Sequence, residues 1–470
     1  MRQVPSALLL AQAMGSAGVE SFFGREFGPL PVIAASEEAA ELLARAHLKV
    51  NNTRAAIHLG GGKFRVPALE GLDEIPRAGV SRNDEGPDAG RILLSTGSQT
   101  RTVPVRSRTV VIDDLDDIAA IESLLKSGSE VEFELRVDPW APASPIDTTR
   151  RSAGAPKQEP DLEGAALISH SSSVIALAGP GVVHAGAVTG LHDLAVAGGI
   201  GVLNTWGAKG VFDWRSRHHL ATVGLQELDF ELGGLADVDL IVGTGLDQRE
   251  SPDWRWRLSP FVIVEPATLT SVAEILATSS DRTSDRTAKN DRIDVPPIRS
   301  RLAEVTQQGW VVDRPPLQPS RVTRNYAEVF GSSGLVAADP GIAGYWVART
   351  FATTGAAGSV IVPSESNVDG FACACLLVDR LRRPLRPALA VVDAPVHPMV
   401  HSILDLAAGL GVNIAVEAWG SDGDQIEADA HLERLRALTP GSHHGVISLA
   451  TDPRQLPRML DVAGRIIAWN

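Results

Sequence analysis

Cysteine is scarce in this sequence, and its scarcity limits the kinds of site that the chain can build. The two that occur, Cys373 and Cys375, lie two positions apart in an apolar stretch. Two such cysteines cannot form a disulfide framework, and a zinc site would need further ligands at suitable spacing. We therefore expect buried thiols in a reducing environment and a cytoplasmic protein.

Long runs of positive charge and of apolar residues are also missing. Lys and Arg number 43 against 57 Asp and Glu, and the resulting formal charge of -14 repels phosphate backbones and anionic lipid. No uninterrupted apolar run reaches the ~18 residues of a membrane-spanning helix. The opening "MRQVPSALLLAQAMGSAGVESFF" continues into an acid-bearing amphipathic segment, so we expect it to belong to the fold and not to a secretion signal. Neither nucleic acid nor a membrane is an expected partner.

The sequence does contain a regular alternation of two kinds of segment. Short apolar runs rich in β-branched residues alternate with helical stretches rich in alanine and leucine. This alternation predicts α/β domains with parallel sheets covered on both faces. A chain of 470 residues suggests about three domains. The proline-rich joint "VDPWAPASP" and the polar run "TSSDRTSDRTAKNDRIDVPP" separate them, and we place the domains at 1–145, 165–277 and 316–470, with a linker at 278–315.

Two glycine motifs follow predicted strands. The turn "GPG" at 179–181 comes between a strand and a helix, where free N–H groups can hold an anion, although it is neither a full GxGxxG nor a P-loop. Gly60, Gly61 and Gly62 follow "RAAIHL" and would allow a ligand to approach the backbone closely. Taken alone, the first motif is better explained by a tight turn without a ligand, whereas a flexible loop and a ligand-binding loop explain the second equally well.

Acidic residues mark the start of one predicted helix and the end of one predicted strand. Glu37 and Glu38 open the helix "EEAAELLARAHLKV", where they complement the helix dipole without any catalytic role. Asp393 ends the apolar run "PALAVVD". The carboxyl end of such a strand is where α/β proteins usually meet their ligands.

The second domain carries a more specific pattern. The phrases "GVLNTWGAKGVF", "ATVGLQELD" and "VDLIVGTGLDQRE" include Asn204, Thr205, Lys209, Gly224 and Glu250. This pattern resembles the central domain of thiamine-diphosphate-dependent enzymes of the acetolactate synthase and benzoylformate decarboxylase type. The resemblance implies three consecutive doubly wound parallel-sheet domains: a shortened pyrimidine-binding domain, a central domain and a diphosphate-binding domain.

The resemblance also implies cofactors and site residues. Thiamine diphosphate and Mg²⁺ would be the cofactors. Glu37 matches the family's catalytic glutamate, which exchanges a proton with the aminopyrimidine ring. Gly60 to Gly62 stand in place of the family's usual SGPG loop along the cofactor. Asp393 matches the aspartate of the GDG motif, which binds the Mg²⁺ that pins the diphosphate.

Around Asp393 the sequence departs from the family pattern. The GDG triplet reads "VDA" with Pro395 next, and the later strand, which in the family ends in Asn-Asn, ends in "EAW" at 417–419. Asp369 takes the place of a methionine that supports the cofactor's bent shape. Ala and Pro restrict a turn that must approach the diphosphate, and the missing asparagine removes a Mg²⁺ ligand. These departures predict a degenerate diphosphate and metal site.

Two functions are compatible with this pattern. The chain is either an acetolactate-synthase-like enzyme that decarboxylates and joins small 2-oxo acids, or a non-catalytic homologue. The non-catalytic homologue would serve as a scaffold or as one subunit of a hetero-oligomer with an intact homologous partner. The resemblance further implies a dimer or tetramer of the chain with itself, and it leaves room for FAD or ADP in the central domain, as in some relatives.

Overall fold

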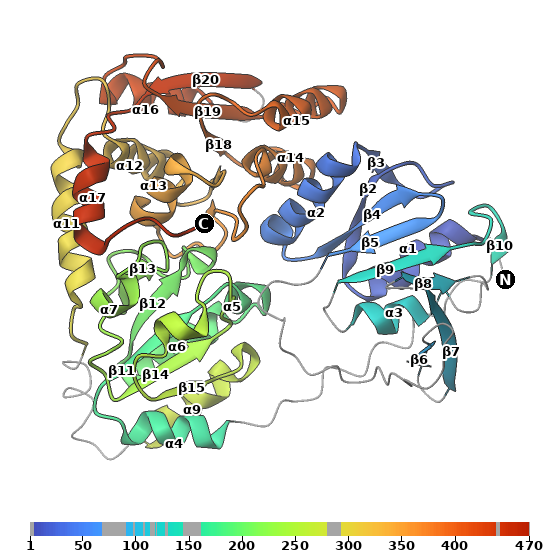
Figure 1. Cartoon of the computed structure of the whole chain (residues 1–470), viewed down its shortest axis with the longest axis horizontal. Coiled ribbons are helices and arrows are strands. Elements are labelled where there is room, and N and C mark those ends of the chain that lie inside the picture. The colour runs from blue at the N-terminus through green and yellow to red at the C-terminus, as the bar shows by residue number, and fades with distance from the viewer. Residues whose placement is uncertain are drawn as a thin grey trace. The chain divides into compact units, whose positions relative to one another are not determined.

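The computed structural model describes residues 4–67, 91–96, 99–106, 109–112, 118, 120–126, 130–143, 161–279, 293–438 and 442–469 (Figure 1). The chain divides into two compact units, residues 1–157 and 158–470. Within the described residues, no helix is long and apolar enough to cross a membrane.

The first unit is built on a mixed sheet with the strand order β3-β2-β4-β5-β9-β8-β7-β6. Its strands are β2 (Val19–Gly24), β3 (Val32–Ala34), β4 (Arg54–Gly60), β5 (Lys63–Val66), β6 (Arg91–Thr96), β7 (Gln99–Arg106), β8 (Thr109–Ile112) and β9 (Val131–Leu135), and β1 (Val4–Pro5) pairs separately with β10 (Pro142–Ala143). Its helices are α1 (Ser6–Ser16), α2 (Glu37–Asn51) and α3 (Ala120–Leu125). Strands β3, β2 and β4 run parallel, as expected, but β5 turns back antiparallel to β4.

The second unit begins with a parallel sheet of order β13-β12-β11-β14-β15. Its strands are β11 (Val174–Ala178), β12 (Gly201–Thr205), β13 (His219–Val223), β14 (Leu240–Thr244) and β15 (Phe261–Ile263). The accompanying helices are α4 (Leu162–His170), α5 (Gly181–His184), α6 (Val188–Gly198), α7 (Asp229–Leu232), α8 (Asp253–Trp256) and α9 (Leu269–Ser279). Separate apolar clusters pack on its two faces, which is the covered parallel sheet that the sequence predicts.

A second parallel sheet in the same unit has the order β17-β16-β18-β19-β20. Its strands are β16 (Leu335–Ala338), β17 (Val360–Ile361), β18 (Ala388–Asp393), β19 (Ala415–Gly420) and β20 (Gly445–Ala450). Its helices are α12 (Pro319–Phe330), α13 (Ile342–Thr350), α14 (Phe371–Arg382), α15 (Pro398–Gly409), α16 (Ala428–Ala437) and α17 (Gln455–Ala463). The α/β fold class with several sheet-based domains is thereby confirmed.

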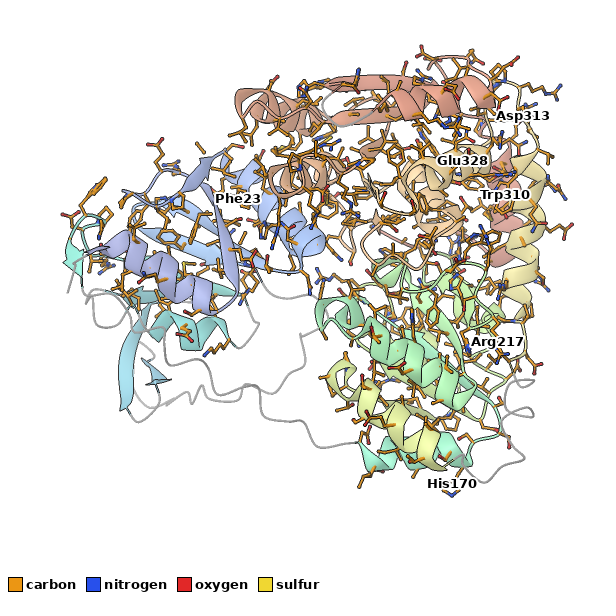
Figure 2. The ribbon with its side chains drawn as sticks, turned by 180° about the vertical axis from the view of Figure 1, so that it is seen from behind. Phe23, His170, Arg217, Trp310, Asp313 and Glu328 are labelled. Atoms are coloured by element: carbon orange, nitrogen blue, oxygen red, sulfur yellow. The ribbon has the colours of Figure 1, made fainter. Side chains whose placement is uncertain are left out.

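Helix α11 (Pro297–Trp310) lies inside the segment 278–315 that the sequence analysis treats as a linker. It packs against α12 and α17 (Figure 1). Its residues Ile298 and Val305 are buried. Trp310 ends the helix (Figure 2). Its ring meets that of Trp214 edge-on at a centroid distance of 5.7 Å. The polar run at 280–292 lies outside the described residues. The linker boundary at 315 thus falls after a packed helix.

Buried polar contacts join the two sheets of the second unit. The Arg349 guanidinium on α13 pairs with Asp229 on α7 at 2.8 Å, and neither side chain is exposed. Tyr345 Oη donates to Gln226 Oε1 at 2.7 Å. Because a buried charge or amide is costly without its partner, these contacts fix one sheet against the other.

Candidate functional site

Asp393 lies at the carboxyl end of β18 and holds the start of helix α13. Its Oδ2 accepts a hydrogen bond from the Ile342 amide at 2.7 Å, and its Oδ1 accepts one from the Ala343 amide at 2.9 Å. Gly341 makes this contact possible, because its φ is +133° and a Cβ there would lie 2.2 Å from Asp393 Oδ2. Burial raises the pKa of the Asp393 carboxyl although the two amide donors oppose that change. Both of its oxygens are therefore engaged as a helix cap.

Asp339, which follows β16, makes a similar contact with the start of helix α14. Its carboxylate accepts hydrogen bonds from the amides of Gly370 and Ala372, each at 2.7 Å. Burial raises the pKa of Asp339 to about 7, and the nearby charges of Asp369 and Asp393 act in the same direction. A helix N-terminus is a natural place for an anionic ligand. At both of these helix starts an aspartate of the chain takes that place.

The neighbouring strand offers no side-chain ligand next to Asp393. Asp393 is paired in register with Trp419 of β19, which is 3% exposed and donates to Tyr326 Oη at 2.8 Å. Two residues earlier, Glu417 is fully buried and pairs with His431 at 3.2 Å. Burial acts to raise the pKa of Glu417, but the charge of His431 and the hydrogen bonds from His431 and Tyr326 outweigh it and the pKa is lowered. Glu417 and Trp419 thus serve the core between β19, α12 and α16.

The loop before α14 is packed closely against the start of α15. Gly370 has a φ of +86°, and a Cβ on it would lie 2.8 Å from Met399 Cγ. The preceding residue, Asp369, is exposed. Its charge is therefore solvated, which resolves how a carboxylate is tolerated where the family pattern has a methionine.

Glu37 lies in the first turn of α2 and is exposed. Ser36 caps this helix by accepting a hydrogen bond from the Ala39 amide at 3.3 Å. The helix and its cap are as the sequence predicts. Glu37 belongs to the first unit and Asp393 to the second.

The three glycines of the first unit close a β-hairpin. Strand β4 ends at Gly60, and β5 starts at Lys63. The turn between them is formed by Gly61 and Gly62. The φ angles of the three glycines are +100°, +58° and +77°. The Gly62 carbonyl accepts the Leu135 amide at 2.8 Å, and a Cβ on Gly62 would lie 2.1 Å from the Leu135 oxygen. Backbone pairing with β9 accounts for at least this glycine without any ligand.

The glycine turn of the central domain has a similar explanation. The Gly181 amide donates to the Gly245 carbonyl at 2.9 Å, and a Cβ on Gly179 would lie 2.3 Å from the same carbonyl oxygen. Helix α5, which the turn begins, has four residues. The turn therefore packs against the loop after β14.

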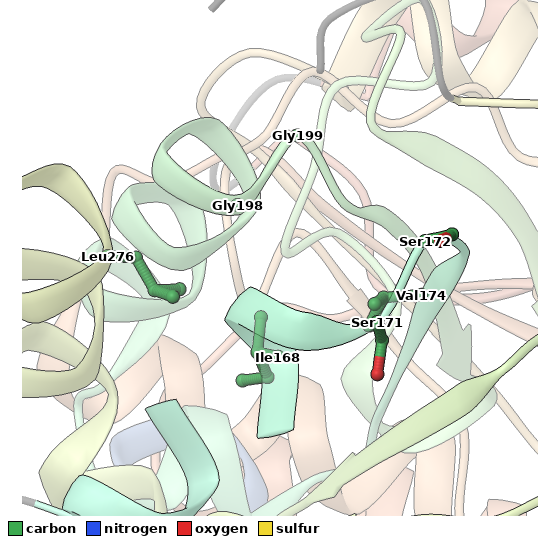
Figure 3. A pocket seen from close by; sticks show the side chains of 7 residues that line it. All are labelled: Ile168, Ser171, Ser172, Val174, Gly198, Gly199 and Leu276. Atoms are coloured by element: carbon green, nitrogen blue, oxygen red, sulfur yellow. The ribbon is translucent and has the colours of Figure 1, made fainter. Parts of the chain in front are cut away.

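A small pocket lies at the opposite, amino end of β11 (Figure 3). Its volume is about 20 Å³, which is room for a water molecule but not for a nucleotide. The residues that line it are Ile168, Ser171, Ser172, Val174, Gly198, Gly199 and Leu276. FAD or ADP in the central domain stays a prediction, and this pocket is not its place.

The carboxyl edge of the second parallel sheet does not fit a magnesium diphosphate. Mg²⁺ requires octahedral oxygen coordination of good geometry. Asp393 is already engaged with both oxygens, and its neighbour across the ladder is a tryptophan. The residues present suit a capped and closed edge.

Asp339, Gly341 and Gly370 were not predicted from the sequence as site residues. A signal was present, because "LVAADPG" repeats the pattern of a buried strand that ends in an aspartate. Two strand-end aspartates on adjacent parallel strands lie at the same edge of the sheet. Their helix partners, however, could not be inferred without the tertiary structure.

The comparison with known families supports the assignment of a central domain of the thiamine-diphosphate enzyme type to this part of the chain. Residues 163–268 match the family model described as "Thiamine pyrophosphate enzyme, central domain". The match spans the elements from α4 to the turn before α9 and includes the whole β11–β15 sheet. A search of curated proteins found no match to the chain.

Proposed function

With a thiamine pyrophosphate enzyme central domain as the premise, we propose that the chain is a non-catalytic member of that family, whose third domain does not hold the diphosphate and Mg²⁺ by itself. It would act as a scaffold or as one subunit of a hetero-oligomer with an intact homologous partner. The observation that carries this proposal is the Asp393 carboxylate, both of whose oxygens cap α13.

Three further features support the proposal. Trp419 occupies the ladder position beside Asp393 and is buried in the core. Asp339 fills the start of α14, the second helix N-terminus at this edge. Met399 fills the space next to Gly370. An anionic cofactor at this edge would have to displace carboxylates that are already hydrogen-bonded, and two like charges at one helix start repel each other.

Glu37 fits the hetero-oligomer in a specific way. Its carboxylate is exposed at the start of a capped helix. The departures from the family pattern around Asp393 do not affect this helix. In the family, active sites form between the first domain of one subunit and the third domain of another. This chain could therefore supply the glutamate to a partner that supplies an intact diphosphate site.

Calorimetric titration of the full chain with thiamine diphosphate and Mg²⁺ tests the proposal. We expect no binding heat with ligand up to ~1 mM. Asp393→Ala should instead lower the free energy of unfolding by ~1 kcal/mol, because it removes the cap of α13. The control is Asp405→Ala, which removes an exposed acid from the outer face of α15.

The opposite result has a clear meaning. Micromolar binding that Asp393→Ala abolishes would refute the proposal and favour the acetolactate-synthase-like enzyme. In that case Glu37 and Asp393 would be its proton relay and metal ligand, and a screen of small 2-oxo acids would follow.

A further inference from the structure

The segment Gly464–Trp469 leaves helix α17 and crosses back to the first sheet of the second unit. It runs antiparallel to the loop Leu225–Leu228, which follows β13, with a bridge between Gln226 and Ile466. The Glu227 amide donates to the Arg465 carbonyl at 3.1 Å, and the Ile467 amide donates to the Leu225 carbonyl at 3.0 Å. The segment is thus joined by backbone hydrogen bonds to the loop after β13, from which it is far removed in sequence.

Gln226 lies where this segment meets helix α13. It is fully buried, and its Nε2 donates to the carbonyls of Gly464 at 2.7 Å and Met459 at 3.0 Å. Its Oε1 accepts from Tyr345 Oη at 2.7 Å and from Arg349 Nη2 at 3.1 Å. One amide therefore connects the segment, α17 and α13, and each connection is buried and costly to break without replacement.

Trp469 makes a second connection at the other end of the segment. Its Nε1 donates to the Pro363 carbonyl at 2.8 Å, and Nε1 of Trp206 donates to the same carbonyl at 3.1 Å. The two indole rings meet edge-on, with centroids 6.0 Å apart. Trp206 follows β12 in the first sheet, and Pro363 follows β17 in the second. The Trp469 ring therefore contacts one residue that follows a strand of the first sheet and one that follows a strand of the second.

The segment itself has few buried groups. Apart from Ala468, its residues are partly or fully exposed, and the ion pair of Arg465 with Glu227 lies at the surface, where such pairs contribute little. Opening of such a segment costs much less than opening of the core that it covers.

We propose that Gly464–Trp469 is a strap that locks the first sheet of the second unit to the second sheet, and that its release is the step that lets the two sheets separate. The strap opens first because it is short and mostly exposed, and it has far fewer buried contacts than the sheets that it joins. The buried contacts around Gln226 and Trp206 then lose the partners that hold them closed. This device does not depend on whether the third domain binds a cofactor.

Hydrogen exchange of the full chain, measured by mass spectrometry, tests the strap. Trp469→Ala removes one ring contact and one hydrogen bond, each of about 1 kcal/mol. We expect amide exchange to accelerate at least ~10-fold at Glu227 and also at Gly207, whose amide is bonded to Glu250 and not to the strap. Trp254→Ala is the matched control, because Trp254 is 81% exposed on α8.

A second variant perturbs the strap without removing a ring. Gly464 has a φ of +82°, and a Cβ there would lie 2.9 Å from a carboxylate oxygen of Glu227, so Gly464→Ala should accelerate exchange at the same amides. If both variants change exchange only within 464–469, the segment is a passive tail and the proposal fails. Faster exchange at Gly207 in both variants supports it.

Discussion

Lys209 is a buried amine in the second unit. Its side chain is 6% exposed, and its Nζ donates to the Thr222 hydroxyl at 3.4 Å. Burial, with a smaller contribution from the nearby charge of Arg349, lowers the pKa of Lys209 to about 7. In the unfolded chain the amine has its ordinary value of 10.5. Between these two values the unfolded state binds a proton that the folded state does not.

The stability of the protein should therefore rise with pH in this window. Because the unfolded state binds more protons, the free energy of unfolding gains ~1 kcal/mol per pH unit from pH 7 to 9 through Lys209. Below pH 7 the amine is protonated in both states and this gain is absent. Lys209→Met should remove the slope without loss of stability at pH 7. Urea denaturation at a series of pH values measures the free energy of unfolding and therefore this slope.

The control for this prediction is Lys63→Met, which removes an exposed lysine from β5. It should leave the slope between pH 7 and 9 as in the wild type. An unchanged slope in Lys209→Met would mean that Lys209 is hydrated in the folded protein.

At the residue scale, the sequence located Asp393 but not its contacts. Its place at the end of a buried strand follows from the apolar run before it, and the structure confirms that place. The amides that it caps belong to Ile342 and Ala343, about fifty positions earlier in the chain. Local patterns cannot reveal a hydrogen bond between elements whose packing they do not determine. The same holds for Glu417, whose orientation depends on the register of β19.

At the scale of elements, the two turn glycines of the hairpin in the first unit, Gly61 and Gly62, have different surroundings. A Cβ on Gly61 meets nothing within 4 Å, whereas one on Gly62 would lie 2.1 Å from the Leu135 oxygen. Both have positive φ, at +58° and +77°. The strain of the backbone is therefore common to both, and the clash is particular to Gly62.

Alanine substitutions should differ accordingly. Gly61→Ala should cost ~1 kcal/mol, the cost of a left-handed alanine. Gly62→Ala should cost at least ~3 kcal/mol, because it also breaks the pairing of the hairpin with β9. Hydrogen exchange of the β5 and β9 amides reports the free energy of opening for both variants. Equal effects would show that the turn is not packed against β9.

The elements that sequence patterns predicted best were those with local signals. Helix α2 has a serine cap, first-turn acids and an amphipathic pattern, and it forms as expected. The hairpin after Gly60 was not predicted, because its formation depends on β9, some seventy residues later. Helix α11 was assigned to a linker because the polar run before it obscured the apolar spacing of Ile298 and Val305. Non-local pairing explains why the hairpin was not predicted, and neighbouring composition explains why α11 was placed in a linker.

At the scale of the whole molecule, the pair Arg349–Asp229 should determine how firmly the second unit holds together. Removal of one partner of a fully buried pair leaves an uncompensated charge and costs ~3–5 kcal/mol. We expect Arg349→Met to lower the stability of the second unit by this amount. The double variant Arg349→Met with Asp229→Leu should recover most of it, because no charge is then stranded.

Tryptophan fluorescence suits this measurement, since eight of the nine tryptophans lie in residues 158–470 and only Trp140 lies in the first unit. Arg436→Met, which removes an exposed arginine with surface partners, serves as the control. If Arg349→Met and the control Arg436→Met shift the unfolding midpoint equally, the buried pair does not hold the two sheets together.

The two aspartate caps at the edge of the second parallel sheet also constrain the order in which this part of the chain folds. Asp393 and Ile342 are 51 positions apart, and Asp339 and Gly370 are 31 apart. Contacts over such separations form only after the intervening loop has closed. During synthesis, a nascent chain that has not yet reached Asp393 leaves the start of α13 without its cap. Helix α13 therefore gains its final stability only when β18, which ends at Asp393, has been made and paired with β16.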